Sequence, residues 1–146
     1  MVEPAWPNVP PPQGQYVPAV VHGGIAVSAG MTPRVDGRLT VVGTVGTDVS
    51  VPDAFAAAGL AAANALGAIA QAVGGLPNVA RCLRMTVYIA CRADFTEHSA
   101  VADGASAELR RRLGDRGAVA RSAIGVASLP SGAPVEVELM VAAAAG

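Results

Sequence analysis

The sequence predicts a two-layer α/β domain in which two helices cover one face of a mixed sheet. Short runs of alternating apolar residues near both ends indicate strands, and two long middle segments carry helix start and stop signals. The expected order is strand-strand(-strand)-helix-strand-helix-strand-strand, which favours one sheet with its helices on one side. With 146 residues, 52% of them apolar, the chain suits a single domain over residues 16–146.

The N-terminal part predicts an extended arm followed by a hairpin. Residues 1–15 are rich in proline and read as an extended arm. Two apolar runs at 16–21 and 25–28 flank His22-Gly23-Gly24, which is typical of a hairpin turn. Residues 34–38 predict a further turn that opens into a short strand at 39–42.

A first helix is predicted to begin after Ser50, with proline in its first turn and Asp53 three residues after the cap. Gly74-Gly75 and the following proline end it. Its expected apolar face holds Phe55, Ala62, Leu66, Ile69 and Val73.

This helix lies in a stretch, residues 54–80, that has no charged side chain and is long enough to span a bilayer. The stretch is mostly alanine, and glycine and polar residues interrupt it, so it lacks the large side chains that drive insertion. We therefore expect a soluble protein whose helix packs against the sheet.

Period-two alternation from 79 to 89 predicts a central strand. Its expected core face is Leu83, Met85, Val87 and Ile89, and its other face is Cys82, Arg84, Thr86 and Tyr88. A second helix follows the cap at 94–97 and ends at Leu113 before Gly114.

Two final strands are expected at 118–127 and 134–143. In the last strand, apolar side chains are expected on one face, at Val135, Val137, Leu139 and Val141. Glu136 and Glu138 are expected to point to the opposite face. The face of the sheet without helices is too apolar for water, which predicts burial against another subunit.

Composition excludes several classes of function. The chain has no lysine, which rules out a Schiff-base lysine and a phosphate-loop lysine. A net charge of −1 and 3% aromatic residues argue against a nucleic-acid surface. The basic run Arg110-Arg111-Arg112 is expected to face water at a helix end.

Few side chains remain as nucleophiles or metal ligands. Cys82 and Cys91 are spaced for neither a disulfide framework nor a zinc motif, which favours reduced thiols in a cytoplasmic protein. A zinc site would need His22 and His98 to converge with both thiols, and alternating strand faces disfavour it. A reactive thiol and a catalytic His98 stay open as minor hypotheses.

Arg121 is the main candidate for binding. Strand alternation places it beside Ala123, Gly125 and Ala127, which leaves space around its planar guanidinium. Such a fork binds a carboxylate through two parallel hydrogen bonds. The alternative is a structural pair between Arg121 and a glutamate. The carboxylate-clamp hypothesis expects a free guanidinium, and an internal ion pair would count against it.

The segment from Ala120 to Glu138 resembles the C-terminal signature of the Rid/YjgF family, also described as L-PSP endoribonuclease-like. That signature joins an Ala-Arg-Ser segment to a Leu-Pro turn and a Val-Glu-Val-Glu strand, and all three are present. Gly14-Gln15-Tyr16, Ser28-Ala29-Gly30 and the strand at 79–89 resemble further family patterns.

The resemblance implies a chorismate-mutase-like fold that assembles as a homotrimer, with a site in each cleft between subunits. It implies hydrolysis of enamines and imines such as 2-aminoacrylate to a 2-keto acid and ammonia, without metal or organic cofactor. By motif, Arg121 would hold the substrate carboxylate and Glu136 would position water or shuttle a proton. Tyr16 and Gly30 would line the pocket.

Four positions depart from the family pattern, among them Gln15 in place of a proline and Met31 in place of a glutamine. Ala123 stands where a cysteine is frequent, and Ser99 matches a frequent asparagine. These pocket changes motivate an alternative, a non-catalytic trimer that binds small carboxylates. Ribonuclease activity, a label attached to some relatives, is disfavoured by the acidic balance and the scarcity of aromatics.

Overall fold

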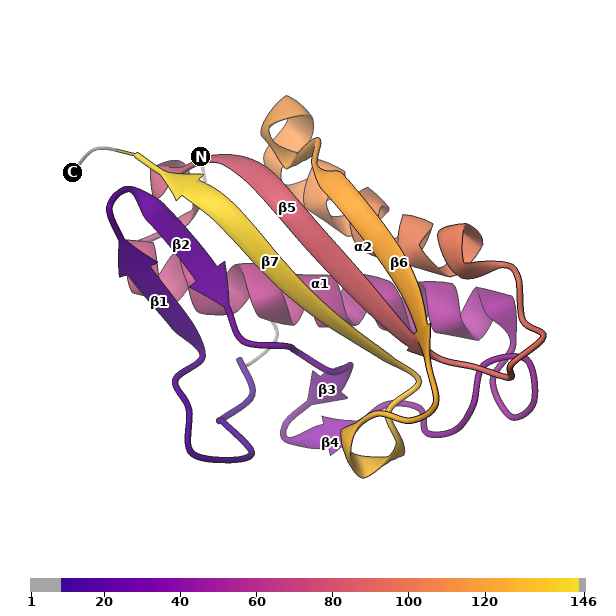
Figure 1. The fold of residues 1–146 in the computed structure, drawn as a ribbon. Helices are drawn as coiled ribbons and strands as arrows, with labels where there is room; N and C mark the ends of the chain where they lie inside the picture. Colours follow the sequence, from indigo (N-terminus) through magenta and orange to yellow (C-terminus); the bar gives the residue numbers. More distant parts are fainter. Residues whose placement is uncertain (1–8, 145–146) are drawn as a thin grey trace.

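The computed structural model describes residues 9–144 and confirms a two-layer α/β domain. A five-stranded sheet has the order β1-β2-β7-β5-β6, and α1 and α2 lie behind the same face of it (Figure 1). The β5–β6 pair is parallel and the other pairs are antiparallel, so the sheet is mixed. The main elements are β1 (Ala19–His22), β2 (Ile25–Ser28), α1 (Val51–Val73), β5 (Val79–Ala90), α2 (His98–Leu113), β6 (Ala120–Val126) and β7 (Val135–Ala143).

The N-terminal arm is described only in part. Residues 1–8 of the predicted arm lie outside the described residues, and residues 9–18 contain no helix or strand. Val9 packs against the core and Pro10 is buried, so this part of the arm is in contact with the domain. The hairpin forms as predicted, although β1 begins at Ala19 rather than at residue 16.

The third strand predicted at 39–42 is wrong. Instead, β3 (Arg34–Val35) and β4 (Arg38–Leu39) form a separate two-residue hairpin. Its turn uses positive φ angles at Asp36 and Gly37. The buried Asn64 of α1 donates hydrogen bonds to the carbonyls of Thr32 and Arg34, each at 3.1 Å, and so fixes this segment to the helix. Leu39 belongs to this small hairpin, and residues 40–42 lie in no strand.

The predicted signals at both ends of α1 are confirmed. The Asp53 amide donates to Ser50 Oγ at 3.2 Å, and Gly74 adopts the left-handed conformation at the C-cap with φ 91°. The helix is long and apolar enough to span a membrane, but 67% of that window is buried inside the domain. A core helix explains this composition better than a membrane span does.

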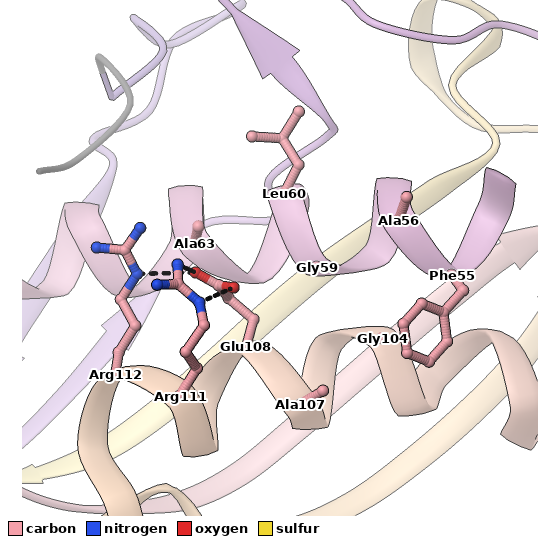
Figure 2. A pocket seen from close by; sticks show the side chains of 10 residues that line it. All are labelled: Phe55, Ala56, Gly59, Leu60, Ala63, Gly104, Ala107, Glu108, Arg111 and Arg112. Atoms are coloured by element: carbon pink, nitrogen blue, oxygen red, sulfur yellow. Dashed lines mark hydrogen bonds and ion pairs between the residues drawn. The ribbon is translucent and has the colours of Figure 1, made fainter. Parts of the chain in front are cut away.

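Phe55 is not on the core face of α1, as the periodicity predicted, but is 42% exposed. It lies at the edge of the contact between the two helices, where small residues allow a close approach (Figure 2). A Cβ added to Gly104 of α2 would lie only 1.9 Å from the carbonyl oxygen of Phe55. Because the sheet covers one side of α1 and α2 covers another, the buried surface of this helix is wide and consists mostly of alanine.

The basic run at the end of α2 only partly faces water. Arg110 and Arg111 are exposed, whereas the Arg112 side chain is 5% exposed. Arg111 and Arg112 both form ion pairs with Glu108, each at 2.7 Å, beside the cavity of about 450 Å³ between the helices (Figure 2). These hydrogen bonds lower the pKa of Glu108 although its burial acts in the opposite direction. The expectation for Arg112 is therefore wrong.

The alternation predicted for β5 holds only in its second half. Met85, Val87 and Ile89 are fully buried, but Cys82 is also buried and Leu83 is only half-buried. A register shift against β7 lies between Cys82 and Arg84. Such a bulge adds one residue to the strand and reverses which face the preceding side chains occupy.

The predicted alternation of β7 is confirmed, and it defines two faces of the sheet. Val135, Val137, Leu139 and Val141 are buried on the helix-facing side. We call the other side the open face. It carries apolar side chains that are at least one-third exposed, at positions Val20, Ile25, Ile124 and Met140. Contact with another subunit through this face remains a prediction.

Candidate functional site

Arg121 lies on the helix-facing side of the edge strand β6. Its partner in the parallel register is Met85, which is fully buried under the helices. The guanidinium turns onto α2, where Nη1 donates to Asp103 Oδ1 at 2.8 Å and to Ser106 Oγ at 2.9 Å. Nη2 donates to Ser99 Oγ at 2.8 Å. We call these four residues the Arg121 cluster.

The expectation of a free guanidinium at Arg121 is wrong, because the side chain forms an internal ion pair. The partner is Asp103 on α2 and not a glutamate of the sheet. The pair is partly solvated, with side-chain exposures of 18% for Arg121 and 62% for Asp103. A guanidinium has five N–H donors. Within residues 9–144, the Nε hydrogen and one Nη2 hydrogen of Arg121 have no protein partner.

Two members of the Arg121 cluster were not predicted from the sequence. Ser99, a predicted binding residue, contacts Arg121, but Asp103 and Ser106 were not singled out. The signal was available, because positions 99, 103 and 106 follow the spacing of one helical face. Polar residues with this spacing on a helix next to a strand arginine indicate that this side of the helix contacts the arginine.

Glu136 lies on the open face, together with Gly30. A Cβ at Gly30 would be 2.6 Å from Glu136 Oε2, so a larger residue at position 30 would displace the carboxyl group. Burial, followed by the nearby negative charge of Glu138, raises the pKa of Glu136. Glu138 accepts a hydrogen bond from the Tyr88 hydroxyl at 2.8 Å. We call Glu136, Gly30, Glu138 and Tyr88 the Glu136 cluster.

The remaining predicted site residues are less constrained. Tyr16 lies in the loop before β1, is 46% exposed, and its hydroxyl accepts a hydrogen bond from the Gln13 amide. Ala123 is half-buried on the helix-facing side, two residues beyond Arg121. Arg121 and Glu136 thus point to opposite faces of the sheet, and one protomer does not bring them together.

The thiols and imidazoles also fall into separate places. Cys82 is buried, and this burial raises its pKa to about 11. Cys91 Sγ lies 3.7 Å from His98 Nε2, a pair that the sequence pattern did not join. His22 is exposed in the β1–β2 hairpin. No group of three metal-ligating side chains occurs within residues 9–144.

Comparison with known proteins gives consistent matches over nearly the whole chain. Residues 3–141 match a family model described as "YjgF/chorismate mutase-like, putative endoribonuclease". Protein TCP17 of Trypanosoma cruzi is 35% identical over 136 residues, covering 92% of this chain and 85% of that protein.

Two solved structures are also similar. The Agrobacterium tumefaciens protein Atu1372, of unknown function, shares 36% identity with a TM-score of 0.86, over 88% of this chain and 82% of that one. A Shewanella oneidensis structure described as a "putative endoribonuclease" shares 28% identity with a TM-score of 0.90, over 94% and 91%.

Proposed function

The chain belongs to the YjgF/chorismate mutase-like family, and from this premise we propose that it hydrolyses small enamines and imines that carry a carboxylate. The proposed substrates resemble 2-aminoacrylate, and the products are a 2-keto acid and ammonia. The observation that carries the proposal is the arrangement at Arg121. Its guanidinium is fixed by α2 through the Asp103 ion pair and two serines, and two of its donors have no partner within residues 9–144.

Arg121 is proposed to bind the substrate carboxylate. The three hydrogen bonds that Arg121 donates to Ser99, Asp103 and Ser106 fix the plane of the guanidinium before any ligand arrives. A carboxylate can then accept hydrogen bonds from the two remaining N–H groups. Binding loses little side-chain conformational entropy, because the fold already holds the guanidinium in one orientation. Asp103 is largely exposed, so its charge is screened by water and repels an incoming anion only weakly.

Glu136 is proposed to activate the water. Its carboxylate removes a proton from water as the water oxygen bonds to the imine carbon, and passes that proton to the imine nitrogen, which gives a carbinolamine. It then transfers the hydroxyl proton to the nitrogen in the same way, so that the C=O bond forms and ammonia leaves as the carbon-nitrogen bond breaks. For an enamine, the protonated carboxyl first gives its proton to the terminal carbon, which produces the imine. Because burial raises the pKa of Glu136, its carboxyl group keeps its proton to a higher pH than an ordinary glutamate does, which favours the proton-donating step.

The site is proposed to form between two subunits of a homotrimer. Because Arg121 and Glu136 point to opposite faces of one sheet, a shared cavity needs the open face of one subunit against the Arg121 side of the next. The exposed apolar residues of the open face support such a contact. We also propose a cytoplasmic location, which fits two cysteines that form no disulfide.

The proposal is tested by 2-keto acid release from 2-aminoacrylate generated in situ. We expect release to rise above the spontaneous rate in proportion to protein concentration, without added metal or organic cofactor. The absence of any acceleration over a range of imino acids would contradict the proposal. Ligand-induced stabilisation by 2-keto acids, measured in the same preparation, shows whether the site is folded and accessible.

The pH dependence gives a separate prediction for Glu136. With a preformed imine as the substrate, Glu136 acts first as a general base and must be deprotonated, so kcat/KM should rise with pH through its pKa. That pKa is raised, so the acid limb should lie above the ordinary glutamate value of about 4.3. Glu136→Gln should remove both the limb and most of the activity.

The matched control is Glu138→Gln, two residues along the same face of β7. It should keep the activity and shift the acid limb to lower pH, because Glu138 is the second cause of the raised pKa. The limb should still lie above the ordinary value, since burial is the larger cause. If the acid limb is unchanged in Glu136→Gln, it reports the titration of another group.

One observation favours a second candidate function, a non-catalytic protein that binds small carboxylates. The Arg121–Asp103 ion pair and the alanine at position 123 leave the Arg121 cluster without a nucleophile or base of its own other than the paired Asp103. In that case 2-keto acids would stabilise the wild-type protein and not Arg121→Ala, while no imine would be turned over. Turnover that depends on Glu136 would exclude this candidate.

A further inference from the structure

A thiol and an imidazole come together at the beginning of α2, outside both clusters described above. Cys91 follows the end of β5 and His98 is the first residue of α2. Cys91 Sγ and His98 Nε2 are 3.7 Å apart, within the range of a hydrogen bond to sulfur, and both residues are half-buried. They line an open cavity of about 580 Å³, together with Arg92, Phe95, Gly125 and their neighbours.

Two neighbours fix this geometry. The buried Phe95 packs edge-on against the His98 ring, with ring centroids 5.3 Å apart and an interplanar angle of 67°. Gly125 of β6 leaves room for the pair, because a Cβ there would lie 2.7 Å from His98 Nε2 and 3.0 Å from Cys91 Sγ. The cavity wall therefore depends on the absence of a side chain at position 125.

The chemistry of the pair follows from its surroundings. Burial is the main cause that raises the pKa of the Cys91 thiol, so the sulfur holds its proton at neutral pH. A thiol in that state becomes a strong nucleophile only when a base accepts its proton during attack. His98 Nε2 is within reach to do so when its other ring nitrogen carries the hydrogen.

We propose that Cys91 and His98 form a nucleophilic pair that adds a thiol to small α,β-unsaturated carbonyl compounds. The Cys91 proton moves to His98 Nε2 as the sulfur bonds to the β-carbon, and the π electrons of the C=C bond move toward the carbonyl as an enolate. The α-carbon then takes the proton from the imidazolium. The product is a thioether, with S–H added across the double bond and no oxidant or reductant consumed.

Small α,β-unsaturated carbonyl compounds suit both the chemistry of the Cys91–His98 pair and the size of its cavity. Sulfur is a soft, polarisable nucleophile, and the β-carbon of a conjugated carbonyl is a soft electrophile. A cavity of about 580 Å³ lies within the range of roughly 300–1,000 Å³ that holds small organic ligands. The proposal requires neither Arg121 nor Glu136, so its failure would leave the proposed hydrolase activity untouched.

The test is alkylation of the full chain by acrylamide at neutral pH, followed by intact mass spectrometry and peptide mapping. Cys82 is an internal reference within the same molecule, because it is buried. We expect Cys91 to react roughly tenfold or more faster than Cys82, and His98→Gln to slow Cys91 by a similar factor. His22→Gln, which replaces the exposed hairpin histidine, is the matched control and should leave the rate unchanged.

A second variant keeps both reacting groups. Gly125→Ala places a methyl group against the sulfur and the imidazole, so it should slow Cys91 alkylation while the thermal unfolding of the protein stays close to that of the wild type. The proposal is overturned if wild-type Cys91 reacts no faster than Cys82. It is equally overturned if folded His98→Gln reacts at the wild-type rate.

Discussion

Arg121→Ala is expected to lower the catalysed release of 2-keto acid by about two to three orders of magnitude. The substitution removes the two donors proposed to hold the substrate carboxylate, and alanine offers no replacement. The fold should persist, because the lost ion pair is partly solvated on its Asp103 side and exposed pairs contribute only about 0–1 kcal/mol to stability. Initial rates and a thermal melt of the same sample measure both effects.

Asp103→Asn is the matched control for Arg121→Ala. It removes the charge of the ion pair, and an amide oxygen can still accept the hydrogen bond from Arg121. If Arg121 binds the substrate, Asp103→Asn should keep the activity and bind carboxylates at least as well as the wild type. If the ion pair serves only the fold, the two variants should have equal and small effects on both activity and stability.

Gly104→Ala is expected to destabilise the protein by about 3 kcal/mol, which lowers the melting temperature by about 10 °C. The new methyl group would lie 1.9 Å from the carbonyl oxygen of Phe55. This atom belongs to the main chain of α1, so no side-chain rotation relieves the clash and the two helices must move apart (Figure 2). Thermal and urea unfolding at one fixed protein concentration measure the loss.

Gly59→Ala, on the facing helix, is the matched control. Its methyl group would lie 3.3 Å from the carbonyl oxygen of Gly104, a tight contact that a small shift relieves. Alanine also gains about 1 kcal/mol over glycine in a helix interior, so the net effect should be small. Equal destabilisation by both substitutions would mean that the close approach at Gly104 does not set the helix spacing.

The elements with local signals were predictable from the sequence. Ser50, Gly74 and the alternation of β7 each have a cause within a few residues, namely a cap, a left-handed turn and a two-residue period. The order of helices and strands followed from these signals, and the resemblance to the family agreed with it. The comparisons then established that family.

The wrong predictions depend on contacts between distant segments. The bulge that buries Cys82 arises from pairing with β7, about sixty residues away. Phe55 lies at the edge of the contact with α2 and is 42% exposed, and helical periodicity alone cannot show where a second helix packs. The predicted strand at 39–42 is reduced to Leu39, which pairs with Arg34 in a small hairpin, and Asn64 bonds this hairpin segment to α1.

Strand alternation predicted the faces of several candidate residues but not the contacts between them. Alternation correctly separated Glu136 from the core and grouped Arg121 with Ala123. The side of each strand that faces the helices depends on strand order. The ion pair with Asp103 depends on the position of α2. The contact between Cys91 and His98 likewise joins the end of a strand to the start of a helix.

Co-production of Arg121→Ala and Glu136→Gln chains in one cell is the measurement that tests the proposed two-subunit site of the proposed trimer most directly. Each variant alone should be almost inactive. In randomly mixed trimers, a site that takes Arg121 from one subunit and Glu136 from the next is intact in roughly a quarter of cases. The purified random mixture, parental trimers included, should therefore recover up to that fraction of wild-type activity. A mixture as inactive as its parents, although it contains both chains, would contradict a catalytic site shared between subunits.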